Sequence, residues 1–574
     1  MGNRAMQVYE AVVKGLESVG VDTAFGGNGE NIASLTLALK HSPKIRPVMT
    51  RHEQAASFMA CGYAMYTNRL GVCFATVGPG AFNLFSGLAV ALSDSYPVLA
   101  ITGYVDLDWR GRGAVNDTSG LNRTPDSQAM FAATTKKSYL LTDAADTCEV
   151  LEEAVNVAFE GRPGPVHVHV PQNLTRRQVT VDDYHDLSLD TAPVRPDPEG
   201  VEEIAEVLAG ALRDGRRIVL LTGFGAIRSH AETAVQNFVE RFRIPLITTL
   251  DGKGVVAETH PLAAGVFSES GHASASKVFR EADVVLAVGN SLNQHATFGL
   301  RKDLFDGKAL IQVNIADSEI GKTYVPDHRL VSDARLAVEA ITDALARRAA
   351  PAGPLEPVNR DHERRHLLPA PGAIHPGRLA QQLGRMLPER AVLLADAGAH
   401  LAWLGYYVDL DKGQNFRKTG TFGPMAGHVN GAIGVKLAQP DRTVVVGCGD
   451  GCYAMAGFEL MTAVQNDIPV IWVIFDDDEY KLIKLYQAAT YGESALVEFQ
   501  NPDFAAYARA CGAVGHRVET LEEFEAAFKT ALTSGRPTVI DARITRWALP
   551  HYSSSPEGVV AGVWETLEER FRHD

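Results

Sequence analysis

Two short acidic segments follow apolar runs at a spacing that would bring them together. Gly449-Asp450-Gly451 ends one expected strand (442–450), and Asp476-Asp477-Asp478 ends the next (468–476), with a helical pattern between them. A strand–helix–strand crossover of this length returns the chain beside its start, so both strand ends meet at one edge of a parallel sheet. Carboxylate oxygens there suit Mg²⁺ or Ca²⁺, and the glycines allow backbone N–H groups to approach phosphate. Either segment alone would be an ordinary turn; together they predict a metal–diphosphate site.

GDG followed at this spacing by Asn-Asn is the fingerprint of thiamine diphosphate enzymes. The chain resembles their acetolactate synthase group, which includes decarboxylases, oxalyl-CoA decarboxylases and 2-hydroxyacyl-CoA lyases. It departs from the pattern because Asp476-Asp477 stands where Asn-Asn is common. The resemblance implies that Mg²⁺ is bound by Asp450, Asp477 and the backbone carbonyl of Glu479. It covers nearly the whole chain, in order.

A second match lies far away in the first part of the chain. Arg51-His52-Glu53-Gln54 follows an expected strand (46–50) and opens a helix. Alone, Glu53 would be only a favourable acid near the positive end of a helix dipole. In the family, a glutamate here contacts N1′ of the cofactor's aminopyrimidine and promotes the tautomer that removes the C2 proton. That role requires surroundings of low polarity.

Other segments resemble the family's cofactor-binding loops. Met425 would wedge between the two cofactor rings, although a core methionine is the plain alternative. His400 would contact the diphosphate, and the turn at Gly78–Asn83 would lie beside the reacting carbon. The expected cofactor-binding residues are Gly29, Glu53, Gly80, Asn83, Gly398, His400, Gly423, Met425, Gly449, Gly451, Cys452 and Tyr480.

Alternating apolar runs and helical patterns predict an α/β fold with three doubly wound parallel-sheet domains. These are a pyrimidine-binding domain (1–181), a central domain (199–346) and a diphosphate-binding domain (371–547), followed by a tail (548–574) that packs on the body or acts as a lid. Proline-bearing segments near 182–198 and 347–361 are the expected linkers. The expected strands are 21–27, 46–50, 71–78, 96–103, 164–171, 216–226, 242–249, 282–289, 308–316, 391–398, 442–450, 468–476 and 535–544.

The central domain holds FAD in some relatives, ADP in others and nothing in many. Glycines after a strand, at Gly223 and Gly225, and an acid after another strand, Asp317, would suit an adenine nucleotide, with Arg162 as a further contact. This glycine pattern alone is a weak signal.

The resemblance also implies a homodimer at least, because active sites in the family lie between the activating domain of one chain and the metal domain of its neighbour. A homotetramer is also implied, because it is common in the family.

Composition excludes some classes of protein. A net charge of −15 argues against nucleic acid as a partner, since phosphate binding needs concentrated Lys and Arg. The six cysteines lack metal-site spacing and indicate reduced thiols in a cytoplasmic protein. No uninterrupted apolar run approaches the ~18 residues of a membrane span.

The sequence favours one reaction but leaves others open. The favoured reaction cleaves a 2-hydroxyacyl-CoA thioester to a ketone or aldehyde plus formyl-CoA, with Glu493 taking the proton of the 2-hydroxyl group. Ser553–Ser555 in the tail resembles the mobile C-terminus of the oxalyl-CoA decarboxylase branch, and residues 113–131 replace a shorter turn of acetolactate synthases. The alternatives are carboligation or decarboxylation of 2-oxoacids, and a catalytically silent relative.

Overall fold

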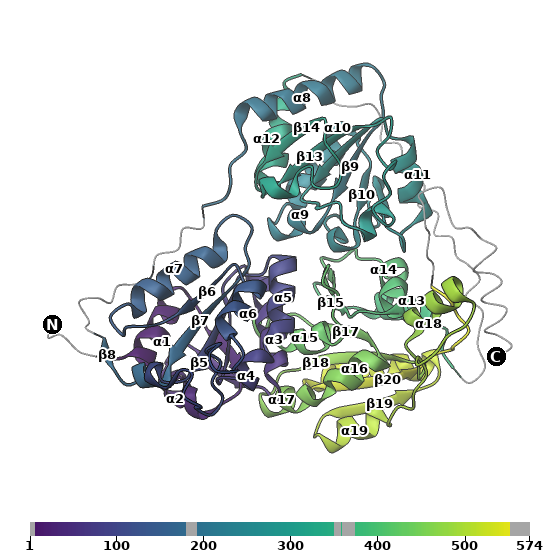
Figure 1. The fold of residues 1–574 in the computed structure, drawn as a ribbon. Coiled ribbons are helices and arrows are strands. Elements are labelled where there is room, and N and C mark those ends of the chain that lie inside the picture. Colours follow the sequence, from purple (N-terminus) through teal and green to yellow (C-terminus); the bar gives the residue numbers. More distant parts are fainter. Residues whose placement is uncertain (1–5, 180–186, 188–191, 349–356, 359–372, 551–574) are drawn as a thin grey trace.

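The computed structural model describes residues 6–179, 187, 192–348, 357–358 and 373–550. Three α/β units form a triangle, with the central unit at the top of Figure 1 and the other two below it. Each is built on one six-stranded sheet whose neighbouring strands run parallel, as the sequence predicted. Of the predicted tail (548–574), residues 551–574 lie outside the described part, as does the segment Ser553–Ser555.

The first sheet has the strand order β3-β2-β4-β5-β7-β6. Its strands are β2 (Thr23–Gly26), β3 (Arg46–Met49), β4 (Gly71–Ala75), β5 (Val98–Tyr104), β6 (Lys137–Leu140) and β7 (Pro165–Pro171). Its helices are α1 (Val8–Ser18), α2 (Ala33–His41), α3 (Glu53–Thr67), α4 (Pro79–Phe82), α5 (Phe85–Asp94), α6 (Ser127–Thr134) and α7 (Thr147–Phe159). On β4, Val72 and Phe74 face a core with α1 and α7, while Cys73 and Ala75 face a core with α3 and α5. Helices therefore cover both faces, which is why the strands are continuously apolar.

The central sheet has the order β11-β10-β9-β12-β13-β14. Its strands are β9 (Ile218–Thr222), β10 (Leu246–Thr248), β11 (Ala263–Val266), β12 (Val284–Val288), β13 (Ala309–Asn314) and β14 (His328–Val331). Its helices are α8 (Pro198–Arg213), α9 (Phe224–Arg228), α10 (Glu232–Phe242), α11 (Ala273–Glu281) and α12 (Ala334–Ala346). Dinucleotide-binding sheets have this order, in which β9 and β12 flank the point where the chain reverses direction.

The third sheet has the order β16-β15-β17-β18-β20-β19. Its strands are β15 (Val392–Ala395), β16 (Asn415–Lys418), β17 (Val444–Gly449), β18 (Val470–Asp476), β19 (Val514–Val518) and β20 (Thr538–Arg543). Its helices are α13 (Pro376–Met386), α14 (Ala399–Tyr407), α15 (Gly427–Ala438), α16 (Asp450–Ala456), α17 (Leu460–Gln465), α18 (Lys481–Tyr491), α19 (Phe504–Ala510) and α20 (Leu521–Ser534). Counted within each unit, this strand order equals that of the first sheet. The two outer units therefore share one topology without an evident sequence repeat.

In the three six-stranded sheets the sequence missed five strands, namely β6, β11, β14, β16 and β19. All five lie at an edge of their sheet. Most edge strands here are only partly buried, as in β14 and β19. Half-buried edges carry no continuous apolar run, and β11 is short and rich in Ala and Gly, so hydrophobic pattern alone does not reveal them.

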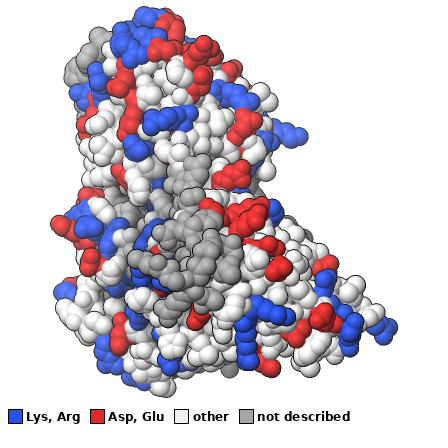
Figure 2. Space-filling view, turned by 90° about the vertical axis from the view of Figure 1, so that its left-hand side faces the viewer, with Lys and Arg blue, Asp and Glu red and all other residues white. Residues whose placement is uncertain are grey.

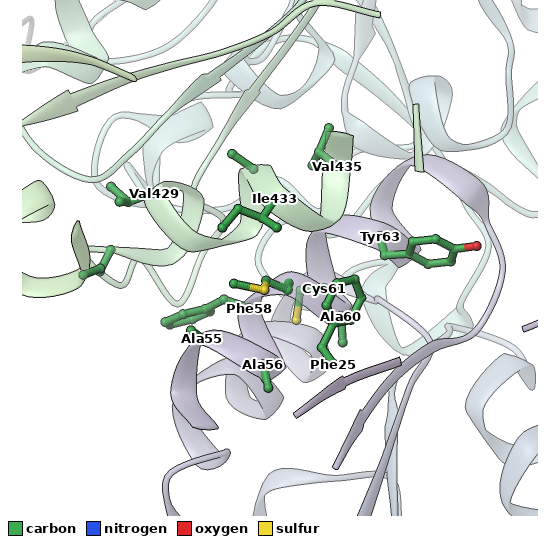
Figure 3. Close-up of a cluster of buried hydrophobic side chains, with 14 of the residues drawn as sticks. Phe25, Ala55, Ala56, Phe58, Ala60, Cys61, Tyr63, Val429, Ile433 and Val435 are labelled. Carbon is green, nitrogen blue, oxygen red and sulfur yellow. The ribbon is translucent and has the colours of Figure 1, made fainter. Parts of the chain in front are cut away.

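Helices α3 and α15 join the first and third units (Figure 3). Phe58 and Met59 of α3 share a buried core with Val429 and Ile433 of α15. Glycine makes this approach possible, because a Cβ added at Gly434 would lie 1.9 Å from the carbonyl oxygen of Met59. The two helix backbones are in direct contact, which fixes the first unit rigidly against the third.

None of the helices in the described ranges is long and apolar enough to cross a membrane. On the face drawn in Figure 2, basic and acidic side chains are interspersed rather than gathered by sign. All six cysteines lie in described segments and are free thiols, five of them buried.

A buried histidine pair lies in the first unit. His167 and His169 on β7 are fully buried, and Thr102 Oγ1 lies 2.8 Å from a ring nitrogen of each. Ser138 and Ser127 contact the other ring nitrogens at 2.8 and 2.9 Å. Burial lowers the pKa of His169 to about 3 and that of His167 well below its usual range. Both rings are therefore neutral in the folded protein.

This pair predicts acid sensitivity of the fold. The folded-state pKa of His169 lies below the unfolded value, so its contribution is complete above about pH 6.5 and is lost as pH falls. At pH 5 the loss is about 2 kcal/mol for His169. We expect His169→Asn to flatten the fall in urea midpoint between pH 7 and pH 5, whereas the exposed His41→Asn should not. Equal slopes in wild type and His169→Asn would contradict this origin.

Candidate active site

A cavity of about 310 Å³ opens at the carboxyl ends of β15, β17 and β18. The third sheet reverses direction between β15 and β17, the place where ligands of open α/β sheets bind. Expected site residues along its wall are Gly398, His400, Gly423, Met425, Gly449, Asp450, Gly451, Cys452, Asp477, Glu479 and Tyr480. Residues separated by more than 70 positions in the sequence thus line one small space.

Asp450 and Asp477 are adjacent in this cavity. The Asp450 carboxylate accepts hydrogen bonds from the backbone N–H groups of Asp477 (3.3 Å) and Asp478 (2.7 Å). The Asn501 amide donates to Asp450 and to Asp476, each at 2.8 Å. Burial raises the pKa of Asp450 to about 7 and that of Asp477 well above its usual range. Two buried carboxylates held together in this way favour binding of a cation.

The three consecutive aspartates have different surroundings. Arg543 bonds Asp476 at 2.6 Å and Asp478 at 2.7 Å, and neither acid lines the cavity. Asp477 does line it, and its carboxylate lies 3.7 Å from the buried Lys481 ammonium. Asp477 is therefore the acid that faces the cavity, and Lys481, which pairs more closely with Glu479, lies beside it.

The remaining walls fit a diphosphate. His400 is buried, burial lowers its pKa to about 4, and its Nε2 has no hydrogen-bond partner among the described residues. A Cβ added at Gly449 would lie 3.1 Å from the His400 ring, and one added at Gly451 would lie 2.4 Å from Tyr480. The glycines thus keep open a space beside His400 Nε2. A buried polar nitrogen of this kind needs a hydrogen-bond partner, and a phosphate oxygen would supply one.

The described residues contain no group of three or more His, Cys, Asp or Glu side chains arranged to hold a metal. A cation here would need oxygens beyond the two aspartates, from a backbone carbonyl such as that of Glu479 and from the ligand. Mg²⁺ is commonly bound in this way, through one or two carboxylates plus phosphate oxygens. The donor set therefore fits a metal bound together with a diphosphate.

Glu53 lies in the first unit, at the edge where β2, β3 and β4 end. Asn83 donates a 2.9 Å hydrogen bond to its carboxylate, and a Cβ at Gly80 would lie 3.1 Å from it. A Cβ at Gly29 would meet Thr76 instead. Glu53, Asn83 and Gly80 are thus grouped as expected. The residues that line the 310 Å³ cavity all belong to the third unit, so Glu53 of the same chain is not among them.

Glu493 is exposed in the loop after α18. It does not line the cavity within the described chain. Its loop is, however, hydrogen-bonded to the segment that follows Asp477. Tyr480 N donates to Val497 O at 2.7 Å, and Phe499 N donates to Asp478 O at 3.1 Å. Glu493 therefore lies on a segment anchored to Asp478 and Tyr480, and its predicted role stays a prediction.

A second cavity, of about 1410 Å³, lies where the three units meet. Arg162, Gly225, Arg228, Arg417 and Lys418 line it. Arg228 Nη1 and Arg417 Nε are buried without a partner in the described structure. Burial also lowers the pKa of Arg228 to about 10. Buried guanidinium nitrogens without a partner, one on each of these two arginines, favour an anionic ligand near the switch point of the central sheet.

The other two residues expected at a nucleotide lie elsewhere. Gly223 begins the turn after β9 but does not line the cavity. A Cβ added at Gly223 would meet the backbone of Gly289. Asp317 is exposed and forms an ion pair with Arg329, outside the wall. Sequence reasoning missed Arg228, Arg417 and Lys418. Only tertiary structure brings these separate segments to one space.

Comparison with known proteins gives three successive matches. They are the Thiamine pyrophosphate enzyme N-terminal TPP binding domain (6–129), the central domain (204–341) and the C-terminal TPP binding domain (396–542). A probable acetolactate synthase large subunit of Methanocaldococcus jannaschii is 30% identical over 93% of this chain and 91% of its own length. An acetolactate synthase of Mycobacterium bovis is 31% identical over 93% and 87%. The acetolactate synthase isozyme 2 large subunit of Escherichia coli is 30% identical over 93% and 94%.

Three parallel-sheet domains in this order define an enzyme dependent on thiamine pyrophosphate, the cofactor also called thiamine diphosphate. The chain belongs to the acetolactate synthase family of these enzymes. The prediction of a thiamine diphosphate-dependent enzyme is thereby confirmed. The relatives' names support the 2-oxoacid alternative better than the 2-hydroxyacyl-CoA lyase that the sequence favoured, and the lyase specificity has no support from them.

The buried arginines of the larger cavity predict affinity for polyphosphate anions. We expect Arg228→Gln to weaken ADP binding by about tenfold or more in calorimetry, because a buried guanidinium bond to phosphate is lost. Asp317→Asn should leave the affinity unchanged, since Asp317 lies outside the cavity. Equal affinities of wild type and Arg228→Gln would contradict an anion site there, and loss of binding in Asp317→Asn would restore Asp317 to the site.

Proposed function

We propose that this chain uses thiamine diphosphate and a divalent metal to decarboxylate a 2-oxoacid and join the remaining fragment to a second carbonyl. The observation that carries the proposal is the meeting of Asp450 and Asp477 in one cavity beside His400. The names of the relatives support the substrate class, because all those compared are acetolactate synthases.

Each residue has a distinct task in this proposal. Bound thiamine diphosphate supplies an electron sink beside the reacting carbonyl. Asp450, Asp477 and the carbonyl of Glu479 hold the metal, and the His400 ring donates to a phosphate oxygen. Met425 shapes the cavity wall. Glu53 shares a proton with the aminopyrimidine nitrogen N1′, which requires Asn83 to hold its carboxylate in place.

Two chains are proposed to build each site. Glu53 lies outside the cavity of its own chain, so an activating carboxylate must come from a second copy. Exposed apolar side chains support such a contact, since Met455 and Phe458, just after Asp450, are 56% and 62% exposed. A large exposed apolar surface is typical of a protein interface. The proposed unit is a homodimer, and two of these form the homotetramer implied by the family.

A second candidate reaction is the cleavage of a 2-hydroxyacyl-CoA to a ketone or aldehyde plus formyl-CoA. The observation that favours it is the position of Glu493, an exposed carboxylate on a loop anchored to Tyr480. This acid would take the proton of the 2-hydroxyl group as the bond beside it breaks.

The larger cavity is proposed to hold an adenine nucleotide, ADP or FAD. Its support is the combination of the dinucleotide-type strand order with Arg228 and Arg417, each of which has one buried nitrogen without a partner in the described chain. Arg162, which also bonds Glu319 at 2.7 Å, borders the same space.

A substrate comparison decides between the two reactions. Purified protein with thiamine diphosphate and Mg²⁺ is given pyruvate or 2-hydroxyisobutyryl-CoA, and products are followed by mass spectrometry. We expect acetolactate and CO₂ from pyruvate, with no formyl-CoA from the thioester. Formyl-CoA and acetone without acetolactate would overturn the first proposal in favour of the second, and Glu493→Ala should then impair cleavage while sparing cofactor binding. In either reaction, Glu53→Gln should still bind the cofactor, but its turnover rate should fall by about 10²–10⁴-fold, because the variant has no carboxylate to exchange a proton with the cofactor.

Mixed dimers test the two-chain site. Glu53→Gln and Asp450→Ala chains carrying different tags are co-expressed, and the hybrid is purified through both tags. Because one of its two sites combines an intact Glu53 with an intact Asp450, we expect about half of wild-type activity, although each variant alone is nearly inactive. A hybrid as inactive as its parents would show that both residues serve within one chain.

A further inference from the structure

A carboxylate from the third unit holds the turn that presents Glu53. Glu459, the last residue of the short helix η8 (Gly457–Glu459), is only 3% exposed. Its Oε1 accepts the backbone N–H groups of Arg51 and His52, each at 2.9 Å. Its Oε2 accepts the Thr462 hydroxyl at 2.6 Å. All these donors are fixed groups, so the carboxylate and the turn hold each other in one geometry.

The position of this turn gives the bonds their significance. His52 is the N-cap of α3, and Glu53 is the first residue of that helix. Two successive N–H groups pointing at one carboxylate at the start of a helix are charge-assisted and strong. If they were lost, the backbone of Arg51 and His52 would be free to rotate, and Glu53 would move with it.

Other contacts near Arg51 and His52 are weaker than the hydrogen bonds to Glu459. The Arg51 guanidinium bonds Gln465 at 2.7 Å and Arg46 bonds the Asn466 carbonyl at 2.8 Å, but both contacts are exposed. Thr462 also reaches the Met49 carbonyl, at 3.4 Å. Surface side-chain contacts are screened and contribute little. Glu459 is thus the buried group that binds the backbone of the turn.

We propose that Glu459 is a positioning residue, which sets the Glu53 carboxylate in place for proton exchange with the cofactor. The inference rests on the proposed role of Glu53. Glu459 itself lies outside the wall of the diphosphate cavity in the described chain, so it acts through the turn and not through the metal. It also follows Asp450 closely along α16 and η8, which links the metal-binding segment to the turn before Glu53.

The test uses the full-length protein loaded with thiamine diphosphate and Mg²⁺. For Glu459→Gln, which keeps the size but loses the charge and one acceptor, we expect C2 proton exchange of the bound cofactor to slow by about 10–100-fold, as small misplacements of catalytic groups do. Amide hydrogen exchange at residues 51–56 should accelerate, while cofactor affinity stays within about threefold of wild type. Gln465→Ala is the matched control, because it removes a contact to Arg51 but no backbone bond, and its C2 exchange should be normal.

The outcomes separate this inference from the proposed function. If Glu53→Gln leaves C2 exchange unchanged, the role of Glu53 is wrong. If Glu53→Gln abolishes exchange while Glu459→Gln exchanges at the wild-type rate, the positioning role of Glu459 is wrong. In the double variant, Glu459→Gln should cause no further loss. Should Glu459→Gln fold poorly, Thr462→Val, which removes one donor to the carboxylate, should give a smaller slowing of the same kind; an unchanged rate there would contradict the inference.

Discussion

The burial of two neighbouring carboxylates, Asp450 and Asp477, is the constraint on which the third unit depends. Burial raises the pKa of both acids, so their charged forms are costly unless a cation balances them. Backbone N–H groups and Asn501 satisfy Asp450, and Lys481 faces Asp477. A cation at these strand ends would therefore stabilise the charged forms of both acids.

The second requirement is that the first and third units keep one fixed arrangement. Backbone contact between α3 and α15 at Gly434 and Met59 holds the two sheets together from the inside. Glu459 holds the turn at Arg51 and His52 from the edge. Because α3 begins at Glu53, the packing that stabilises the fold also sets the direction of this carboxylate, for which we propose the activating role.

Much of the architecture was predictable because buried parallel strands are continuous apolar runs. β4, β9, β17 and β18 are of this kind, and GDG followed by the aspartates could be placed at their ends. Edge strands such as β14 and β19 were not predicted, because they are only half-buried and lack a continuous apolar run. Sequence reasoning also preferred a 2-hydroxyacyl-CoA lyase, whereas the relatives favour 2-oxoacids. Substrate choice depends on side chains around a cavity, and their arrangement has no local signature.

By itself the sequence determined the three α/β units and the cofactor class, because these depend on local pattern, and it predicted Asp450 and Asp477 from their spacing along one crossover and Glu53 from the family resemblance. Tertiary structure alone showed that Asp476 and Asp478 pair with Arg543, that Arg228 and Arg417 share a space, and that Asp317 lies outside it. It also revealed Glu459 beside the turn before Glu53. These relations join residues far apart in the chain, and only packing of whole domains sets such distances.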